Sequence, residues 1–325
     1  MTNWNTFEYK DYCDLKKNEI NNLPNGVNIS TMTASIKDTK LLFNFINIYN
    51  YLELCEDDIL AVVRNENEYR SIINIKKKKK KKNDKRKKRQ FFNQLSVVVR
   101  INEGICEDLD KEKKINFKLF VNGSIQMSGI KNISSVNKAL NKLIIALGKI
   151  KAIKFENQKK IEKISYVSDY DKFNTDKFKI NMINSNYKLR IKINRPNLYQ
   201  LLLKKKINAS YEKAIRACVC IKYPIPEDIR ALSSNPEDEK VLSIFVFQKG
   251  NIIITGAARN KFDIMSAFNF INNIMLTHLD ELVLPEEDER ENDIRRFFNE
   301  VMTENSHKLN NIFNNRIIPK LYKFK

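Results

Sequence analysis

The sequence is short of the residues that build metal sites, disulfide frameworks and membrane spans. Its 325 residues include two histidines and five scattered cysteines, with no Cys-x-x-Cys pair. This scarcity argues against a structural zinc site and a disulfide framework. No apolar run approaches the ~20 residues that cross a bilayer, and residues 1–10 lack a signal-peptide pattern. We therefore expect an intracellular protein without a metal or cofactor.

Signatures of catalysis are also missing. The chain has only seven glycines, and none of them forms a phosphate-binding loop or a nucleophile elbow. No cluster of carboxylates suggests acid–base chemistry. These absences predict that the protein is not an enzyme.

Positive charge is what the chain has in excess. The formal net charge is +20, of which residues 76–89, with twelve Lys or Arg and one Asp, supply +11 and leave +9 elsewhere. A basic remainder suits an anionic partner. The run itself has the composition of a solvated low-complexity insertion. A nuclear-localisation patch or an extra phosphate-binding arm are its functional alternatives.

One stretch of the chain occurs twice, at residues 115–144 and 242–271. At a single offset the matched pairs are Phe120 with Phe247, Gly123 with Gly250, Ile125 with Ile252, Ser128 with Thr255, and Gly129 with Gly256. Asn-Gly or Lys-Gly between apolar runs is typical of a hairpin, because glycine accepts a positive φ without steric cost. Each copy therefore predicts a strand, a tight turn, a second strand and a helix, and the repeat indicates two related halves.

Alternation along these strands separates two faces. The core face is expected to carry Val121, Ile125 and Met127 in the first copy, and Ile252 and Ile254 in the second. The other face combines a phenylalanine with small polar groups: Phe120, Asn122, Ser124, Gln126 and Ser128, then Phe247, Ile253 and Thr255. A solvated face with one stray aromatic is the plain alternative. The same phenylalanine in both copies favours a functional face.

The remaining periodicities suggest a similar plan in each half. Strands are predicted at 27–36, 95–101, 178–183 and 217–221, helices at 40–54 and 198–207, and a second short helix with its exit at 60–63 and 69–75. The predicted organisation is a tail at 1–25, a first repeat at 26–150, a linker at 151–177, a second repeat at 178–278 and an acidic, helical extension at 279–325.

The doubled pattern Phe-x-x-Gly-x-Ile-x-x-(Ser/Thr)-Gly, followed by a helix, resembles the TATA-binding protein family. The family's version is approximately Leu-Ile-Phe-x-Ser-Gly-Lys-x-Val-x-Thr-Gly-Ala-Lys, and the second copy, IFVFQKGNIIITGAA, is the closer match. The resemblance spans residues 26–278. The extra length resembles TATA-binding-like proteins of large nucleocytoplasmic DNA viruses, although an AT-rich protist source would look similar.

The resemblance implies an α+β fold, with two pseudo-symmetric halves forming a curved antiparallel saddle sheet and helices on its convex face. It implies binding and bending of AT-rich double-stranded DNA through the minor groove, where the family wedges phenylalanines between base steps. It further implies recruitment of a B-type factor and RNA polymerase, in the nucleus or a cytoplasmic viral factory. The alternative is a saddle-shaped interaction scaffold with weak or lost DNA binding.

Carried over residue by residue, the resemblance makes Phe120 and Phe247 wedges and Glu212 a contact for the B-type factor. The other DNA-binding residues it implies are Asn28 as a central asparagine, Gln126, Ser128, Ile253 and Thr255 in the groove, Arg100, Lys131, Lys222 and Arg259 near phosphates, and Arg216 as a cation beside phosphates or a narrow groove. The chain departs from the family at four positions: Met182 replaces the second asparagine, Ala258 replaces a lysine beside Arg259, and Gln94 and Arg216 occupy the stirrup phenylalanine positions. Arg216, Met182 and Gln126 favour the scaffold alternative.

Deleting residues 76–89 tests the role of the lysine-rich run. Because phosphate contacts carry no sequence information, the deletion should weaken DNA binding while leaving folding and base preference unchanged. Circular dichroism and binding curves with AT-rich and GC-rich duplexes measure both effects. A changed base preference after the deletion would contradict this prediction.

Overall fold

The computed structural model describes residues 23, 26–65, 67–75, 93–102, 104–155, 160–215, 217–231 and 241–284. The lysine-rich run at 76–89 and Arg216 therefore lie outside the described residues. The predicted tail at 1–25 is described only at Leu23, and the predicted C-terminal extension only up to Leu284.

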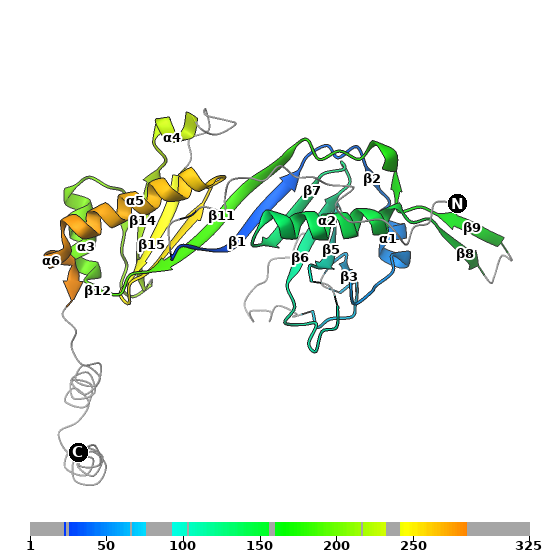
Figure 1. Cartoon of the computed structure of the whole chain (residues 1–325), viewed down its shortest axis with the longest axis horizontal. Coiled ribbons are helices and arrows are strands. Elements are labelled where there is room, and N and C mark those ends of the chain that lie inside the picture. Colours follow the sequence, from blue (N-terminus) through cyan, green and yellow to red (C-terminus); the bar gives the residue numbers. More distant parts are fainter. Residues whose placement is uncertain are drawn as a thin grey trace, which may run out of the picture.

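The helices and strands follow a similar order in the two halves of the chain (Figure 1). The first half contains β1 (Asn28–Ile36), β2 (Leu42–Phe43), α1 (Phe45–Tyr51), β3 (Ile59–Val63), β4 (Tyr69–Ser71), β5 (Gln94–Arg100), β6 (Lys114–Phe120), β7 (Ile125–Ile130) and α2 (Ile133–Gly148). The second contains β11 (Phe178–Lys188), β12 (Lys192–Ile193), α3 (Arg195–Lys204), β13 (Ala209–Ser210), β14 (Cys218–Pro224), α4 (Glu227–Ala231), β15 (Val241–Phe247), β16 (Asn251–Gly256), α5 (Lys261–Thr277), α6 (Leu279–Leu282) and β17 (Val283–Leu284). The exceptions to the common order are β4 in the first half and α4, α6 and β17 in the second. The predicted strand, turn, strand and helix are confirmed in both copies.

Eleven of the described strands form one antiparallel sheet, in the order β13-β14-β15-β16-β11-β1-β7-β6-β5-β3-β4. The strands β1 and β11 pair with each other at its middle. Outward from β1 come the strands of the first half, and outward from β11 come those of the second. The β1–β11 pairing therefore makes the two halves one continuous sheet (Figure 1).

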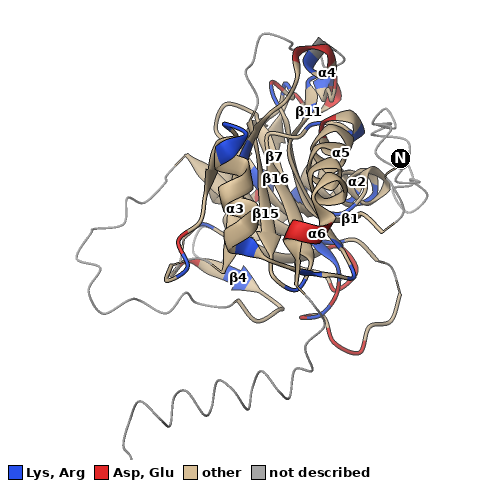
Figure 2. Ribbon diagram, turned by 90° about the vertical axis from the view of Figure 1, so that its left-hand side faces the viewer, with Lys and Arg blue, Asp and Glu red and all other residues tan. Residues whose placement is uncertain are grey.

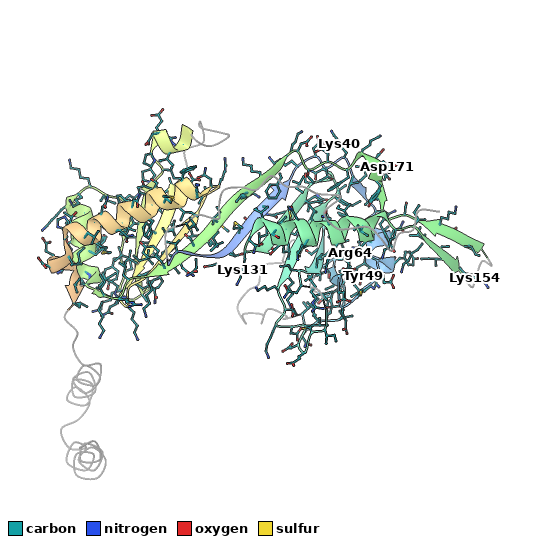
Figure 3. All side chains as sticks on the ribbon, in the orientation of Figure 1. Lys40, Tyr49, Arg64, Lys131, Lys154 and Asp171 are labelled. Atoms are coloured by element: carbon teal, nitrogen blue, oxygen red, sulfur yellow. The ribbon has the colours of Figure 1, made fainter. Side chains whose placement is uncertain are left out.

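The segment between the halves has structure of its own. It contains a hairpin of β8 (Lys151–Phe155) and β9 (Lys160–Ile164), the short strand β10 (Val167–Ser168) and a 3-10 helix at Tyr170–Lys172. The strand β10 pairs with β2, and β17 pairs with β12. The β8–β9 hairpin carries Lys154 and projects from the first half, at the far end of the molecule (Figure 3).

The helices α2 and α5 cover the apolar face of the sheet. Asparagines begin both helices: Asn132 accepts a hydrogen bond from the Ser135 amide at 2.7 Å, and Asn260 accepts one from the Asp263 amide at 2.9 Å. Alternate side chains of the sheet are buried beneath the helices, as expected for a sheet with one covered face. Val121 differs from the prediction, because it lies in the turn and is 55% exposed.

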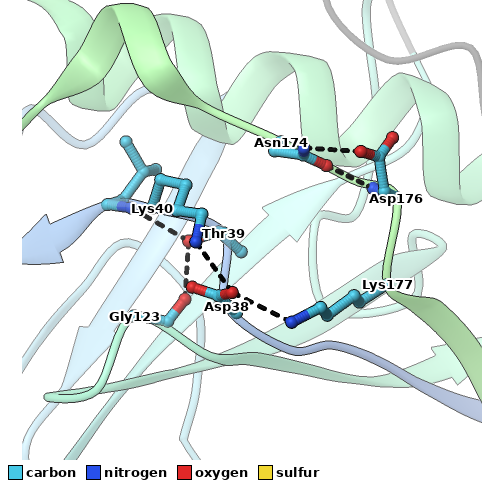
Figure 4. Close-up of polar contacts among 8 residues, drawn as sticks. Asp38, Thr39, Lys40, Gly123, Asn174, Asp176 and Lys177 are labelled. Atoms are coloured by element: carbon cyan, nitrogen blue, oxygen red, sulfur yellow. Dashed lines mark hydrogen bonds and ion pairs between the residues drawn. The ribbon is translucent and has the colours of Figure 1, made fainter.

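Two glycines close the repeated hairpins, and both need a positive φ. Gly123 and Gly250 each have φ +77°. A Cβ atom at Gly123 would collide with the carbonyl of Leu41, and one at Gly250 with the carbonyl of Leu189. In the first half the buried Thr39 hydroxyl also donates to the Gly123 carbonyl at 2.6 Å (Figure 4). Each hairpin is thus held against the loop that follows its own central strand.

Two segments differ from the sequence prediction. Residues 60–63 and 69–75 were expected to form a helix and its exit, but β3 and β4 are strands at the sheet edge. A short buried apolar run does not distinguish strand from helix by periodicity, and its pairing with β5 decides the matter. The helix expected at 40–54 is shorter, because Leu42 and Phe43 pair with β10 and Asn44 caps α1.

Alanine substitutions at Gly250 and at Gly104 should separate the cost of a steric collision from the cost of backbone strain. Gly104 also has a positive φ, +88°, but a Cβ there meets nothing within 4 Å. Gly104→Ala should cost only about 1–2 kcal/mol of unfolding free energy, the strain of a left-handed residue. Gly250→Ala should cost clearly more, because the backbone must also move away from Leu189. Chemical denaturation measures both values, and equal losses would contradict the collision.

Candidate nucleic-acid interface

Within the described residues, the long helices α2 and α5 cover one face of the sheet, and we call the other face the open face. Along β6, Phe117 and Leu119 are fully buried, whereas Lys118 and Phe120 are only half-buried. The same alternation places these residues on the open face: Ser96, Asn116, Lys118, Phe120, Gln126, Ser128, Thr31, Thr33, Ser35, Asn184, Asn186, Ile253, Thr255, Ser243, Phe245 and Phe247. None of these residues is acidic.

Most strands of the open face lack charged side chains, so this face can approach an anionic or uncharged surface without repulsion. The strands β1, β7, β15 and β16 contain no charged residue, and they appear tan in Figure 2. Hydroxyl and amide groups supply most of the polarity instead. Such a face suits the minor groove, which offers few hydrogen-bonding features.

Phe120 and Phe247 occupy the same place in the two hairpins. Each is the last residue of its strand, half-buried on the open face. Phe120 lies opposite Gln94 and Phe247 lies opposite Cys218. Five strand steps separate β6 from β15 in the sheet order, roughly 24 Å at ~4.8 Å per step.

The two predicted hydroxyls and their neighbours also lie on the open face. Ser128 lies opposite Asn116 on one side and Thr33 on the other. The Thr255 hydroxyl donates to the side-chain oxygen of Asn184. Sequence reasoning did not single out Asn184, which could have been found only from the pairing of β11 with β16.

The centre of the sheet differs from the prediction for Asn28. Met32 pairs with Ile183 at the middle of the β1–β11 ladder, while Asn28 pairs with Asn186 near its end. The ladder has register shifts between Ile29 and Thr31, and between Thr33 and Ala34. Bulges of this kind leave no clear sequence signal.

Asn28 instead borders a hollow beside the second phenylalanine. Phe247 and Ile253 line the hollow, together with the amides of Asn28, Asn186 and Asn251. The Asn186 amide donates to the Ser30 hydroxyl at 2.7 Å. Tyr187 also borders this hollow, but its hydroxyl donates to Asn272 of α5 at 3.0 Å, and burial raises its pKa.

Two of the four predicted phosphate contacts, Lys131 and Lys222, are exposed to solvent, whereas Nε and Nη1 of Arg259 are buried. Lys131 is exposed and projects from the segment that enters α2 (Figure 3). Lys222 is exposed and donates to the Ser243 hydroxyl at 2.8 Å. Arg259 is half-buried, and its amide donates to the Asp263 carboxylate at 2.8 Å.

Arg100 is buried, and its guanidinium group pairs with carboxylates inside the fold. Its side chain is 2% exposed and lies 3.3 Å from the Asp57 carboxylate and 3.8 Å from that of Glu112. The nearby Lys142, also buried, donates to the Asp57 carbonyl at 2.5 Å. The two cations thus anchor the turn before β3, and Arg100 lacks the exposure that a phosphate contact needs.

The second stirrup is described only in part. Glu212 and Ile215 are exposed in the loop between β13 and β14, and Arg216 lies outside the described residues. In the described part of the chain, no group of three His, Cys, Asp or Glu could hold a metal ion. No described helix is long and apolar enough to span a bilayer.

Comparison with known proteins identifies the family. No family model matches the chain. A TATA-box-binding protein-like protein of Acanthamoeba polyphaga mimivirus is 31% identical over 283 residues, which covers 85% of this chain and 71% of the relative. The chain belongs to the TATA-box-binding protein-like family. The structure of Methanococcus jannaschii TBP is 16% identical with a TM-score of 0.42, covering 75% of this chain and 95% of that one. Membership in the TATA-box-binding protein-like family rests on the sequence relationship.

The two phenylalanines of the open face should contribute little to stability. Phe120→Ala and Phe247→Ala should leave the melting temperature nearly unchanged, because neither ring is part of the core. Phe117→Ala is the matched control on the buried side of β6 and should cost about 3–5 kcal/mol. Thermal and chemical denaturation of the three variants test this. A large loss in either open-face variant would place that ring in the core.

Proposed function

We propose that this protein is a transcription initiation factor that binds AT-rich DNA through its open face and bends it at the minor groove. The observation that carries the proposal is the pair Phe120 and Phe247, half-buried at matching ends of two hairpins. A ring that projects from a sheet can insert between base pairs and unstack one step. Family membership supports the same function.

The placement of the two rings supports a pair of wedges. Phe120 and Phe247 lie five strand steps apart and at opposite ends of the strands, because β6 and β15 run in opposite directions and each ring ends its strand. Two kinks at the two ends of the open face bend the duplex around the sheet. The gain in contact area offsets the cost of unstacking two steps.

We further infer that the two halves are related by a pseudo-twofold axis, with α2 and α5 on the convex side of a curved sheet. The ladder around Met32 and Ile183 supports this inference. The repeated hairpins follow this ladder outward in both halves, with Phe120 and Gly123 in one and Phe247 and Gly250 in the other. The mirrored strand order on either side of β1 and β11 supports it as well.

The proposed partners follow from the charges and the exposed loop of the second half. Lys131, Lys222 and Arg259 flank the open face and approach phosphates. Glu212 in the exposed loop contacts a factor of the B type, which connects the complex to RNA polymerase. The site of action is the nucleus or a cytoplasmic viral factory, and the protein acts without catalysis.

A second candidate function is an interaction scaffold with weak DNA binding. The observation that favours it is the internal use of Arg100, which removes one cation from the DNA-facing set. Polar residues at Lys118 and Gln126 also reduce the apolar area of the first hairpin.

A salt-titrated binding assay with AT-rich and GC-rich duplexes separates the two functions. The initiation factor should prefer the AT-rich duplex and lose affinity steeply with salt. Phe120→Ala and Phe247→Ala should each lower the bend angle, measured by energy transfer between labelled duplex ends, and reduce the AT preference. Lys131→Ala is the control. It should weaken binding to both duplexes equally and reduce the slope of log K against log salt concentration by roughly 0.9. No binding at low salt would support the scaffold.

A further inference from the structure

The open face differs between the two halves at two matched positions. Lys118 in the first copy corresponds to Phe245 in the second, and Gln126 corresponds to Ile253. In each hairpin the two side chains lie directly opposite each other across the strands. The first hairpin therefore presents an ammonium group and an amide where the second presents a ring and a branched alkyl group.

The difference extends to the neighbouring strands. Lys118 lies opposite Ser96 of β5, and Gln126 lies opposite Ser35 of β1. The polar row consists of these four residues: Ser96, Lys118, Gln126 and Ser35. The apolar row consists of Cys220, Phe245 and Ile253, which are paired in the same way, and it ends on the central strand at Asn186 as the polar row ends at Ser35. The two rows lie at corresponding distances from the centre of the sheet.

Asn116 adds an unused acceptor beside the polar row. It precedes Lys118 on the same face of β6, and its side-chain oxygen is buried without a hydrogen-bond partner. The corresponding residue of the second hairpin is Ser243, whose hydroxyl accepts a hydrogen bond from Lys222. Within the polar row itself, the side-chain oxygen of Gln126 can accept from an N–H group of a ligand.

The minor groove contains only one such donor. Every base pair presents acceptors there, but only G·C adds the guanine N2 amino group. Phe245 and Ile253 offer no acceptor to that amino group, whereas the side-chain oxygen of Gln126 can accept from it. Lys118 donates to the acceptors that all base pairs share.

We propose, building on the proposed function, that the polar row accepts a G·C pair under the first half, whereas the apolar row admits only A·T pairs. The chemistry of the two rows therefore orients the protein on its DNA. A G·C pair at one end of an AT-rich site selects that end for the first half.

Three duplexes of equal length test the proposal without knowledge of the natural site. Each contains an inverted-repeat AT-rich site. The first has no G·C pair, the second has one G·C pair at one end, and the third has one G·C pair at each end. Because the protein can turn around on such a site, a single G·C pair can always lie under the first half. The first two duplexes should bind within about twofold, and the third about tenfold more weakly, the usual cost of one unfavourable pair.

Variants exchange the chemistry of the two rows. The double variant Lys118→Phe/Gln126→Ile should bind the duplex with one G·C pair about tenfold more weakly than the duplex with none. Ile253→Gln should restore binding of the duplex with two G·C pairs, a gain that misfolding cannot produce. Lys131→Leu removes one charge outside the rows and should weaken all three duplexes equally. Melting curves verify that each variant is folded.

The outcomes distinguish this inference from the function on which it rests. An equal loss for each added G·C pair, or no rescue by Ile253→Gln, would overturn the orientation by the two rows and leave DNA binding standing. Failure to bind even the duplex without G·C would overturn the proposed function. A footprint on the one-ended duplex that shows both orientations equally would also contradict the inference.

Discussion

The antiparallel pairing of β1 with β11 is the interaction on which the rest of the structure depends. Each half has its own hairpins and long helix. Without the other half, however, its central strand, β1 or β11, would be an unpaired edge of the sheet. An unpaired central strand would expose a row of backbone donors and acceptors. The pairing of β1 with β11 satisfies the backbone hydrogen bonds of both strands and aligns the open faces of the two halves. Phe120 and Phe247 share one surface because of this contact.

Alternation along the strands separates the groups that stabilise the fold from those that meet a partner. Phe117 and Phe120 lie three residues apart on β6, yet one is fully buried and the other faces outward. Substitutions on the open face therefore change binding chemistry at little cost to the core. That freedom explains how Lys118 and Gln126 can stand where the second half has Phe245 and Ile253.

Positive charge has two separate uses in this protein. Arg100 and Lys142 are buried and stabilise the turn around Asp57, where desolvation makes a paired cation necessary. Lys131 and Lys222 are exposed and available to an anionic partner. A net charge alone does not distinguish these uses, because only packing determines which cations are left in water.

The sequence by itself determined the hairpins, the helices that follow them and the two outward-facing phenylalanines. Those features depend on local chemistry: glycine at positive φ in Gly123 and Gly250, and apolar alternation along each strand. Only the tertiary structure decided that β3 is a strand, that Asn28 lies away from the centre and that Arg100 is buried. Each of these depends on a partner distant in the chain, namely β5, the bulged β1–β11 ladder and the acidic residues at Asp57 and Glu112. Pairing across such distances is set by the packing of the whole sheet, which local periodicity does not encode.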